Sequence, residues 1–271
     1  MTDSLPAWVR VAGPPAAPPL LLVSGLGGTA GFWQPIQSIL AAHFRVASFD
    51  QPGCGKRPAP ERSVTIESLA LDAEAISRQV FGERPVTVIG HSTGGTIAQT
   101  LAATRGDLVN ALVLSGTWQK ADHYMQALFA FRTALLRQAP DLSEGFTTLL
   151  TRDPSEITKN ALDPHPVAAP SAAIAIARIK ALLAFDGTPL MPSIQVPSLV
   201  LGAQDDRIVP GSLQLALHAG LAHSALHMLP DGGHFFPISR LHHFTRHVED
   251  WLADKAVSTP KNMNRTYGRN A

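Results

Sequence analysis

The sequence has 271 residues and a formal net charge of +1, from 22 basic and 21 acidic side chains. The basic residues form no stripe, so a nucleic-acid partner is excluded, and no apolar run is long enough to span a membrane. Hydrophobic residues make up 45% of the chain, as in a globular protein, and the single cysteine, Cys54, excludes an intrachain disulfide. We expect a cytoplasmic protein without a signal peptide.

Six short apolar runs recur along the chain, and most end beside a glycine or an aspartate. Runs of this kind are typical of strands that are buried on both faces of a parallel sheet. Helical spacing appears between them, notably at 66–80 and 244–252. The alternation predicts an α/β fold with a mostly parallel central sheet flanked by helices. The six runs are 20–23, 45–49, 86–89, 111–114, 198–201 and 225–229.

The regular spacing is interrupted once, between the runs at 111–114 and 198–201. This gap is far longer than a simple crossover between parallel strands requires. Because it is rich in helix formers, we interpret 119–193 as a helical cap inserted after the sixth strand, above the sheet edge where ligands bind. An ordinary run of structural helices is the alternative. The expected division is a core of 1–118 and 194–254, the cap, and a flexible tail of 255–271.

Gly90-His91-Ser92-Thr93-Gly94 fits the pattern G-x-S-x-G. It follows a predicted strand and opens a predicted helix, which is the context in which this pattern presents a serine nucleophile on a sharp turn. The glycines permit the tight backbone path, and the helix N-terminus supplies a positive potential near the serine. A structural serine in a glycine-rich turn is the alternative interpretation.

A serine hydroxyl needs a base, and His234 is the candidate. It follows the last predicted strand and precedes the last helix, so it should lie at the same sheet edge as Ser92. An acidic group should orient the imidazole. Both Asp205 and Asp206 follow the preceding strand, and we favour Asp206, four residues before Pro210. The chain order Ser, Asp, His is that of α/β-hydrolases.

An oxyanion at the substrate carbonyl needs backbone N–H donors. One is expected from Thr93, directly after the nucleophile. The other is expected from the glycine-rich loop after the first predicted strand, with Leu26 favoured over Gly27. The same loop fits a loose dinucleotide fingerprint, Gly25-x-Gly27-x-x-Ala30, and that interpretation is the alternative. No Cys and His residues stand at ligand spacing, so we expect neither a metal nor a cofactor.

The partner is expected to be a small, partly apolar substrate. Trp118 and Phe129 are candidates to line its cavity, and Arg132 or Arg178 is available for a carboxylate. The aromatic pair would otherwise be plain core, and the arginines would otherwise lie on the surface. A homodimer is left open, because oligomeric state cannot be read from this sequence.

Residues 19–252 resemble the α/β-hydrolase family, and several stretches are similar to the aminoacrylate hydrolases of bacterial pyrimidine degradation and to 3-oxoadipate enol-lactonases. The resemblance implies hydrolysis of a small C–N or ester bond through an acyl-enzyme. Cofactor-free opening of an enol-lactone or a C–C bond is the alternative, followed by a non-enzymatic ligand-binding relative. Many relatives carry His-Gly where this chain has Ser24-Gly25. The stretches are 23–28, 32–33, 50–55, 116–118, 205–210 and 232–234.

Overall fold

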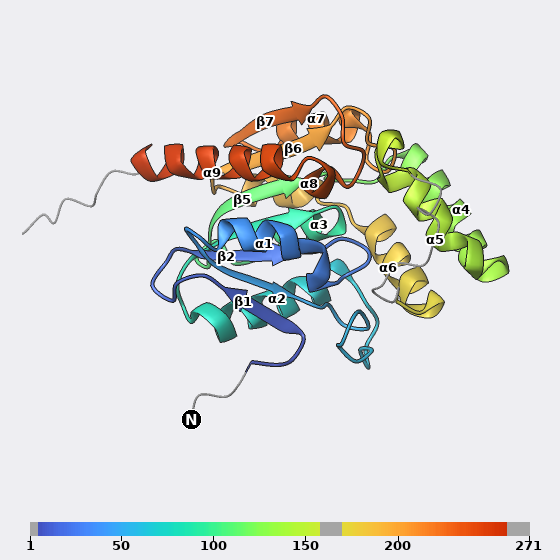
Figure 1. Cartoon of the computed structure of the whole chain (residues 1–271), viewed down its shortest axis with the longest axis horizontal. Helices are drawn as coiled ribbons and strands as arrows, with labels where there is room; N and C mark the ends of the chain where they lie inside the picture. The colour runs from blue at the N-terminus through green and yellow to red at the C-terminus, as the bar shows by residue number, and fades with distance from the viewer. Residues whose placement is uncertain (1–4, 158–169, 259–271) are drawn as a thin grey trace, which may run out of the picture.

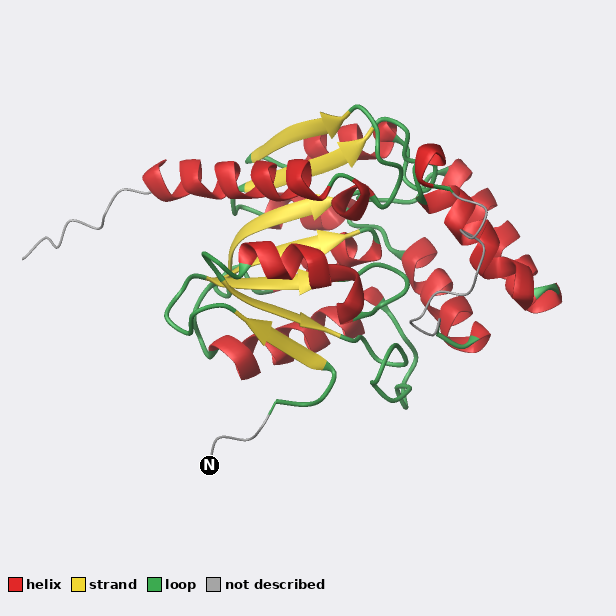
Figure 2. Cartoon of the chain, in the orientation of Figure 1, coloured by secondary structure: helices red, strands yellow, loops and turns green. Residues whose placement is uncertain are grey.

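A seven-stranded sheet forms the centre of the computed structural model, which describes residues 5–157 and 170–258 (Figures 1 and 2). The strand order is β1-β3-β2-β4-β5-β6-β7, and every neighbouring pair is parallel except β1 and β3. Each of the six apolar runs lies within one of these strands, which confirms the predicted α/β fold. The strands are β1 (Val9–Ala12), β2 (Pro19–Val23), β3 (Arg45–Phe49), β4 (Val86–His91), β5 (Val109–Ser115), β6 (Ser198–Ala203) and β7 (Ser224–Leu229).

Strand β2 shows how the apolar runs are buried on both faces. Leu20 and Leu22 belong to one core cluster, whereas Leu21 and Val23 belong to the other. This period of two is what a strand needs when helices cover both sides of the sheet. The first cluster lies under α1 (Gln34–Leu40), α8 (Phe236–Ser239) and α9 (Leu241–Ser258), and the second lies under α2 (Ile66–Phe81), α3 (Thr93–Thr104) and α7 (Gly211–Gly220).

Helix α2 confirms the helix expected at 66–80. It begins after Thr65, whose hydroxyl accepts the backbone N–H of Ser68, while the Ser68 hydroxyl accepts the backbone N–H of Thr65. This reciprocal cap satisfies two donors that the first helical turn leaves unpaired. Its apolar face then packs on the second core cluster through residues that include Leu69 and Ala73.

Beyond β5 the chain leaves the sheet and builds helices past the carboxyl ends of the strands (Figure 1). These are α4 (His123–Gln138), α5 (Pro140–Thr151) and α6 (Ala172–Ala184), and α4 packs against both of the others. The short helices η2 (Pro154–Glu156) and η3 (Thr188–Ser193) follow α5 and α6, and a further one, η1 (Ala30–Trp33), precedes α1. A third apolar cluster joins α4 and α6 to the core through Trp118, Phe129, Ile179 and Val209.

Two details of the sequence analysis are corrected. The helical insertion follows the fifth strand and not a sixth, because in the described residues only β1 precedes β2 and β5 is therefore the fifth strand. That strand was not predicted, since its four residues form a short antiparallel edge. Helix α9 continues to Ser258, so the tail expected from 255 starts too early. Ala253, Lys255 and Ala256 are good helix formers and explain the extension. The rest of that tail, 259–271, lies outside the described residues.

None of the helices in 5–157 and 170–258 is both long enough and apolar enough to cross a membrane.

Candidate active site

Ser92 lies at the turn between β4 and α3 with a backbone φ of 57°. In the described part of the chain it is the one non-glycine residue with a positive φ, a conformation that L-residues adopt only under constraint. The flanking glycines provide that constraint. A Cβ on Gly90 would lie 2.3 Å from the carbonyl oxygen of Gly94, and a Cβ on Gly94 would lie 2.0 Å from that of Val23. The G-x-S-x-G pattern therefore forms the strained strand-to-helix turn expected of it.

His234 and Asp206 meet at the same sheet edge. Nδ1–H of His234 donates to Oδ2 of Asp206 at 2.8 Å, and both side chains are buried. The other carboxylate oxygen of Asp206 accepts the backbone N–H groups of Ile208 and Val209 at 2.8 and 2.9 Å. These contacts fix the orientation of the carboxylate. Because the carboxylate holds the proton on Nδ1, Nε2 of His234 is left as the nitrogen that can accept another.

The neighbouring Asp205 contacts the backbone of the same loop. Its carboxylate accepts the N–H groups of Gly232 and Gly233, at 3.3 and 2.9 Å. Of the two aspartates left open by the sequence, Asp206 is the one that contacts the imidazole. Asp205 instead holds the loop that carries His234.

His91 is next to Ser92 in the chain and packs against His234 in space. It directly precedes Ser92, and its ring centroid lies 4.8 Å from that of His234 and 5.0 Å from that of Phe32. Its Nδ1 is hydrogen-bonded to the hydroxyl of Ser115 at 3.1 Å. Burial, with the nearby His234, holds the pKa of His91 well below its usual value, so the imidazole is neutral at pH 7.

The glycine-rich loop after β2 lies directly against the serine. A Cβ on Gly25 would lie only 2.9 Å from the Cβ of Ser92. Among the described residues, the backbone N–H groups of Leu26, Gly27 and Thr93 donate to no protein acceptor. Thr93 directly follows the serine, and Leu26 and Gly27 directly follow Gly25, which lies against it. These N–H groups are available to hold a negatively charged oxygen, with Leu26 and Gly27 both still candidates.

Ser24, which stands where many relatives carry histidine, forms its hydrogen bond within this loop. Its hydroxyl donates to the carbonyl of Thr29 at 2.6 Å and so closes the loop on itself. A serine in this place therefore braces the loop through a local hydrogen bond.

Trp118 and Phe129 lie in the apolar cluster between α4, α6 and the core, and Leu26 packs against that cluster. The indole N–H of Trp118 is buried without an acceptor. Arg132, half-buried on α4, lies over the ring of Phe129 at 5.1 Å and donates to the hydroxyl of Thr147. Burial lowers the pKa of Arg132 to about 10, so it keeps its charge at pH 7. In the described residues it forms no ion pair, which leaves its charge available to an anionic group.

Arg178 occupies a different position from either one expected for it. It is 1% exposed on α6, and its guanidinium donates to the carbonyls of Gly25 and Leu26 and to the side chain of Gln51. The sequence does carry a signal for this burial. Arg178 falls on the apolar face of α6, at helical spacing from Ala175 and Leu182. A charged residue on such a face needs buried partners.

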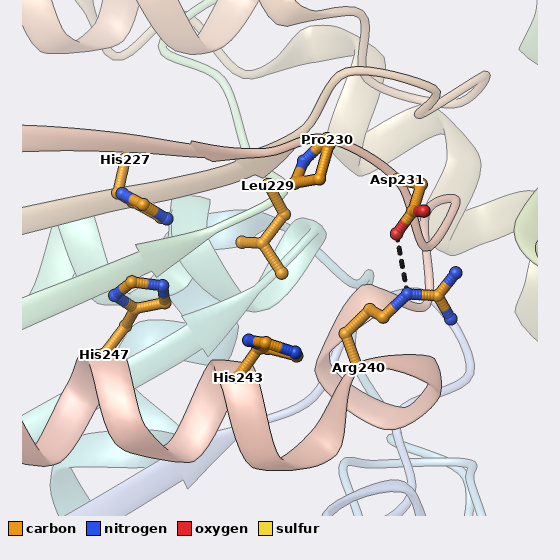
Figure 3. A pocket seen from close by; sticks show the side chains of 7 residues that line it. All are labelled: His227, Leu229, Pro230, Asp231, Arg240, His243 and His247. Atoms are coloured by element: carbon orange, nitrogen blue, oxygen red, sulfur yellow. Dashed lines mark hydrogen bonds and ion pairs between the residues drawn. The ribbon is translucent and has the colours of Figure 1, made fainter.

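A separate cavity of about 440 Å³ lies between β7, the turn that follows it, and α9 (Figure 3). Three histidines line it, together with Arg240, whose charge is paired with three carboxylates. In the described ranges no group of three or more Cys, His, Asp and Glu side chains is placed to hold a metal ion. This cavity contains none of the predicted site residues. Its lining is His227, Leu229, Pro230, Asp231, Arg240, His243 and His247.

Known proteins resemble this chain over most of its length. The profile of the alpha/beta hydrolase fold family matches residues 18–241. The chain belongs to the α/β-hydrolase family. The expected fold and the resemblance are thereby confirmed, and the family indicates a hydrolase.

Individual relatives and one solved structure also resemble the chain over most of its length. A protein of Variovorax paradoxus (strain S110), named "Putative carbamate hydrolase RutD", is 33% identical over 94% of this chain and 98% of its own. A protein of Stutzerimonas stutzeri with the same name is 32% identical over 89% of this chain and 94% of its own. The enol-lactonase from Burkholderia xenovorans LB400 has a solved structure that aligns with a TM-score of 0.81. It is 25% identical and covers 90% of this chain and 95% of its own.

Proposed function

We propose that this chain is a serine hydrolase that cleaves a small C–N or ester bond through an acyl-enzyme. The observation that carries the proposal is the 2.8 Å hydrogen bond between His234 and Asp206 at the sheet edge that also bears the strained Ser92. A buried carboxylate, an imidazole with a free Nε2 and a serine on a sharp turn are the parts that acyl transfer requires.

In the proposed reaction Oγ of Ser92 attacks the substrate carbonyl carbon while its proton passes to Nε2 of His234. The carbonyl π electrons move to the oxygen, which the N–H groups of Thr93 and of Leu26 or Gly27 then bind. As the tetrahedral species collapses, the bond to the leaving group breaks and His234 returns the proton to that group. Water repeats the sequence on the acyl-enzyme, which releases the acid and restores the Ser92 hydroxyl. No metal or cofactor takes part in these steps.

The substrate class follows from the relatives and from the cap. Both relatives described above carry the name of a putative carbamate hydrolase, which favours a small carbamate or related C–N substrate. Arg132 would bind an anionic group of that substrate, and Trp118 and Phe129 would bound its apolar part. With the proposed cap boundaries of 119–193, Phe129 and Arg132 lie in the cap and Trp118 lies just before it.

An enol-lactone is the second candidate, supported by the structural similarity to the Burkholderia enol-lactonase. The same serine, histidine and aspartate would open the lactone, because its carbonyl is attacked in the same way as that of an ester. We retain the cytoplasm as the proposed location, since the single cysteine is buried and free, and a homodimer stays a prediction.

The test is a substrate panel measured on the wild type, Ser92→Ala and Ser38→Ala. The panel contains a p-nitrophenyl carbamate, p-nitrophenyl acetate and an enol-lactone. We expect Ser92→Ala to lose turnover by about 10⁴-fold or more on every substrate that the wild type cleaves. Ser38 is exposed on α1, and its variant should match the wild type. Full turnover by Ser92→Ala would overturn the proposal, whereas preference for the enol-lactone over the carbamate would select the second candidate.

A further inference from the structure

We propose that Arg178 is a positioning residue: it orients the two peptide groups whose N–H donors would form half of the oxyanion hole, and it adds positive charge beside them. This inference rests on the proposed function. It concerns a residue of the inserted helices that acts on the loop after β2, more than 150 residues away in the chain.

The two hydrogen bonds from Arg178 fall on consecutive peptide groups. Nη2 donates to the carbonyl of Gly25 at 3.1 Å, and Nε donates to the carbonyl of Leu26 at 2.8 Å. The Gly25 carbonyl shares its peptide group with the N–H of Leu26, and the Leu26 carbonyl shares its group with the N–H of Gly27. In a trans peptide the N–H points away from the C=O, and the described residues contain no cis peptide bond. Both candidate donors therefore point away from the guanidinium.

Gln51 completes the support. Its side-chain oxygen accepts from Nη2 of Arg178, and its side-chain N–H₂ donates to the carbonyl of Ser24 at 2.7 Å. Its backbone N–H donates to the carbonyl of Gly28 at 2.7 Å. The carbonyls of Ser24, Gly25, Leu26 and Gly28 thus each accept a hydrogen bond from Arg178 or Gln51, and these bonds oppose flipping of the peptide groups of this loop.

The charge of Arg178 is unusually placed. Its guanidinium is buried, forms no ion pair among the described residues, and leaves Nη1 without an acceptor. A buried charge without an opposite charge is unfavourable. Carbonyl dipoles offset part of that, and an oxyanion bound on the far side of the same two peptide groups would offset more. Hydrogen bonds in such a chain polarise one another, so each peptide N–H becomes a stronger donor.

A purely structural role, in which Arg178 only ties α6 to the core, makes a different prediction. Loss of such a tie lowers stability or loosens the substrate site. Loss of positioned donors instead lowers kcat and weakens binding of a tetrahedral transition-state analogue, with little change in KM. The experiment must therefore separate tetrahedral from planar ligands.

The first measurement is kcat and KM of the wild type, Arg178→Lys, Arg178→Met and the control Lys180→Met, on a substrate that the wild type cleaves. Lys180 is exposed two residues further along the same helix. Titration with a fluorophosphonate counts the reactive sites, so that rates refer to folded protein only. The second measurement is the affinity of each protein for a boronic acid, which becomes tetrahedral on Ser92, and for the planar acid product.

We expect both Arg178 variants to lose about 100-fold in kcat, as on removal of an oxyanion donor, and a similar factor in boronate affinity. KM and product affinity should change by less than about threefold. Lysine should not rescue, because an ammonium group lacks the planar fork that spans two carbonyls. Lys180→Met should match the wild type.

The outcomes are distinguishable. If the Arg178 variants keep wild-type kcat and boronate affinity, or if all ligands weaken equally, the positioning role is overturned while the proposed function stands. If the wild type itself binds no boronate and no fluorophosphonate, the proposed function fails, and the role of Arg178 fails with it.

Discussion

Asp205 and Asp206 are adjacent in sequence, yet their carboxylates bind different parts of one short segment. Asp205 accepts the backbone N–H groups of Gly232 and Gly233, and Asp206 accepts Nδ1–H of the next residue, His234. The loop after β6 therefore holds the backbone of the loop after β7 and orients the imidazole of His234, which the second loop carries. The two aspartates should accordingly be separable by substitution.

Asp206→Asn should lower kcat by about 10³- to 10⁴-fold, because an amide disfavours the required imidazole tautomer and does not stabilise the imidazolium. KM should change little. Asp205→Ala should instead lower the free energy of unfolding by about 1–2 kcal/mol, since two backbone donors lose their acceptor, and should retain far more activity. Steady-state kinetics and urea unfolding of both variants provide the check. The reverse ranking of the two kcat values would contradict these assignments.

The strain at Ser92 predicts a gain in stability when the serine is removed. Ser92→Gly should raise the free energy of unfolding by about 1 kcal/mol, because glycine adopts a φ of 57° without strain, while hydrolysis is lost. Ser38→Gly, in the exposed face of α1, should lower it by about 0.5 kcal/mol through helix propensity. Denaturant unfolding of the two variants measures both signs. A loss of stability in Ser92→Gly would show that its backbone is not strained.

The close approach at Gly94 should tolerate no side chain. A Cβ there would lie 2.0 Å from a backbone oxygen of β2, which cannot move without shifting the strand. Gly94→Ala should cost about 3 kcal/mol of stability. At exposed Gly106 the nearest atom to an added Cβ is 3.6 Å away, so Gly106→Ala should be close to neutral. Thermal unfolding of the pair tests the turn directly, and equal melting temperatures would contradict it.

The depressed pKa of His91 predicts an acid-dependent loss of stability. In the unfolded chain this histidine binds a proton near pH 6.5, whereas in the folded chain burial delays that proton to a lower pH. The contribution of neutral His91 to the free energy of unfolding is therefore complete above pH 6.5. As the pH falls from 6.5 towards the folded pKa, this contribution is lost by up to about 1.4 kcal/mol per pH unit. His91→Gln should flatten the unfolding free energy against pH in that window. His43→Gln, on the surface, should keep the wild-type slope.

The sheet, the serine turn and the histidine–aspartate pair could be predicted because local patterns encode them. Apolar runs of strand length and a G-x-S-x-G turn are short-range features. The topology then brings the carboxyl ends of parallel strands to one edge, so the loops that carry Ser92, Asp206 and His234 lie at that edge. The same patterns do not separate Asp206 from Asp205, because the two residues are adjacent and follow the same strand.

The contacts of Arg178 could not be predicted in the same way. Its carbonyl partners at Gly25 and Leu26 lie 153 and 152 residues away, and no local pattern encodes a contact of that separation. The sequence shows a charge on an apolar helical face without showing what compensates it. Strand β1 was missed for a related reason: only four residues long, it is defined by its antiparallel partner β3.

The residue that carries the acyl group tests the proposed nucleophile most directly. The wild type is mixed with p-nitrophenyl acetate, quenched in acid within the first turnover, digested and examined by mass spectrometry. We predict one acetyl group, on Ser92, which is absent in Ser92→Ala. Turnover without any acylated Ser92, or an acetyl group on another residue that is required for turnover, would contradict it.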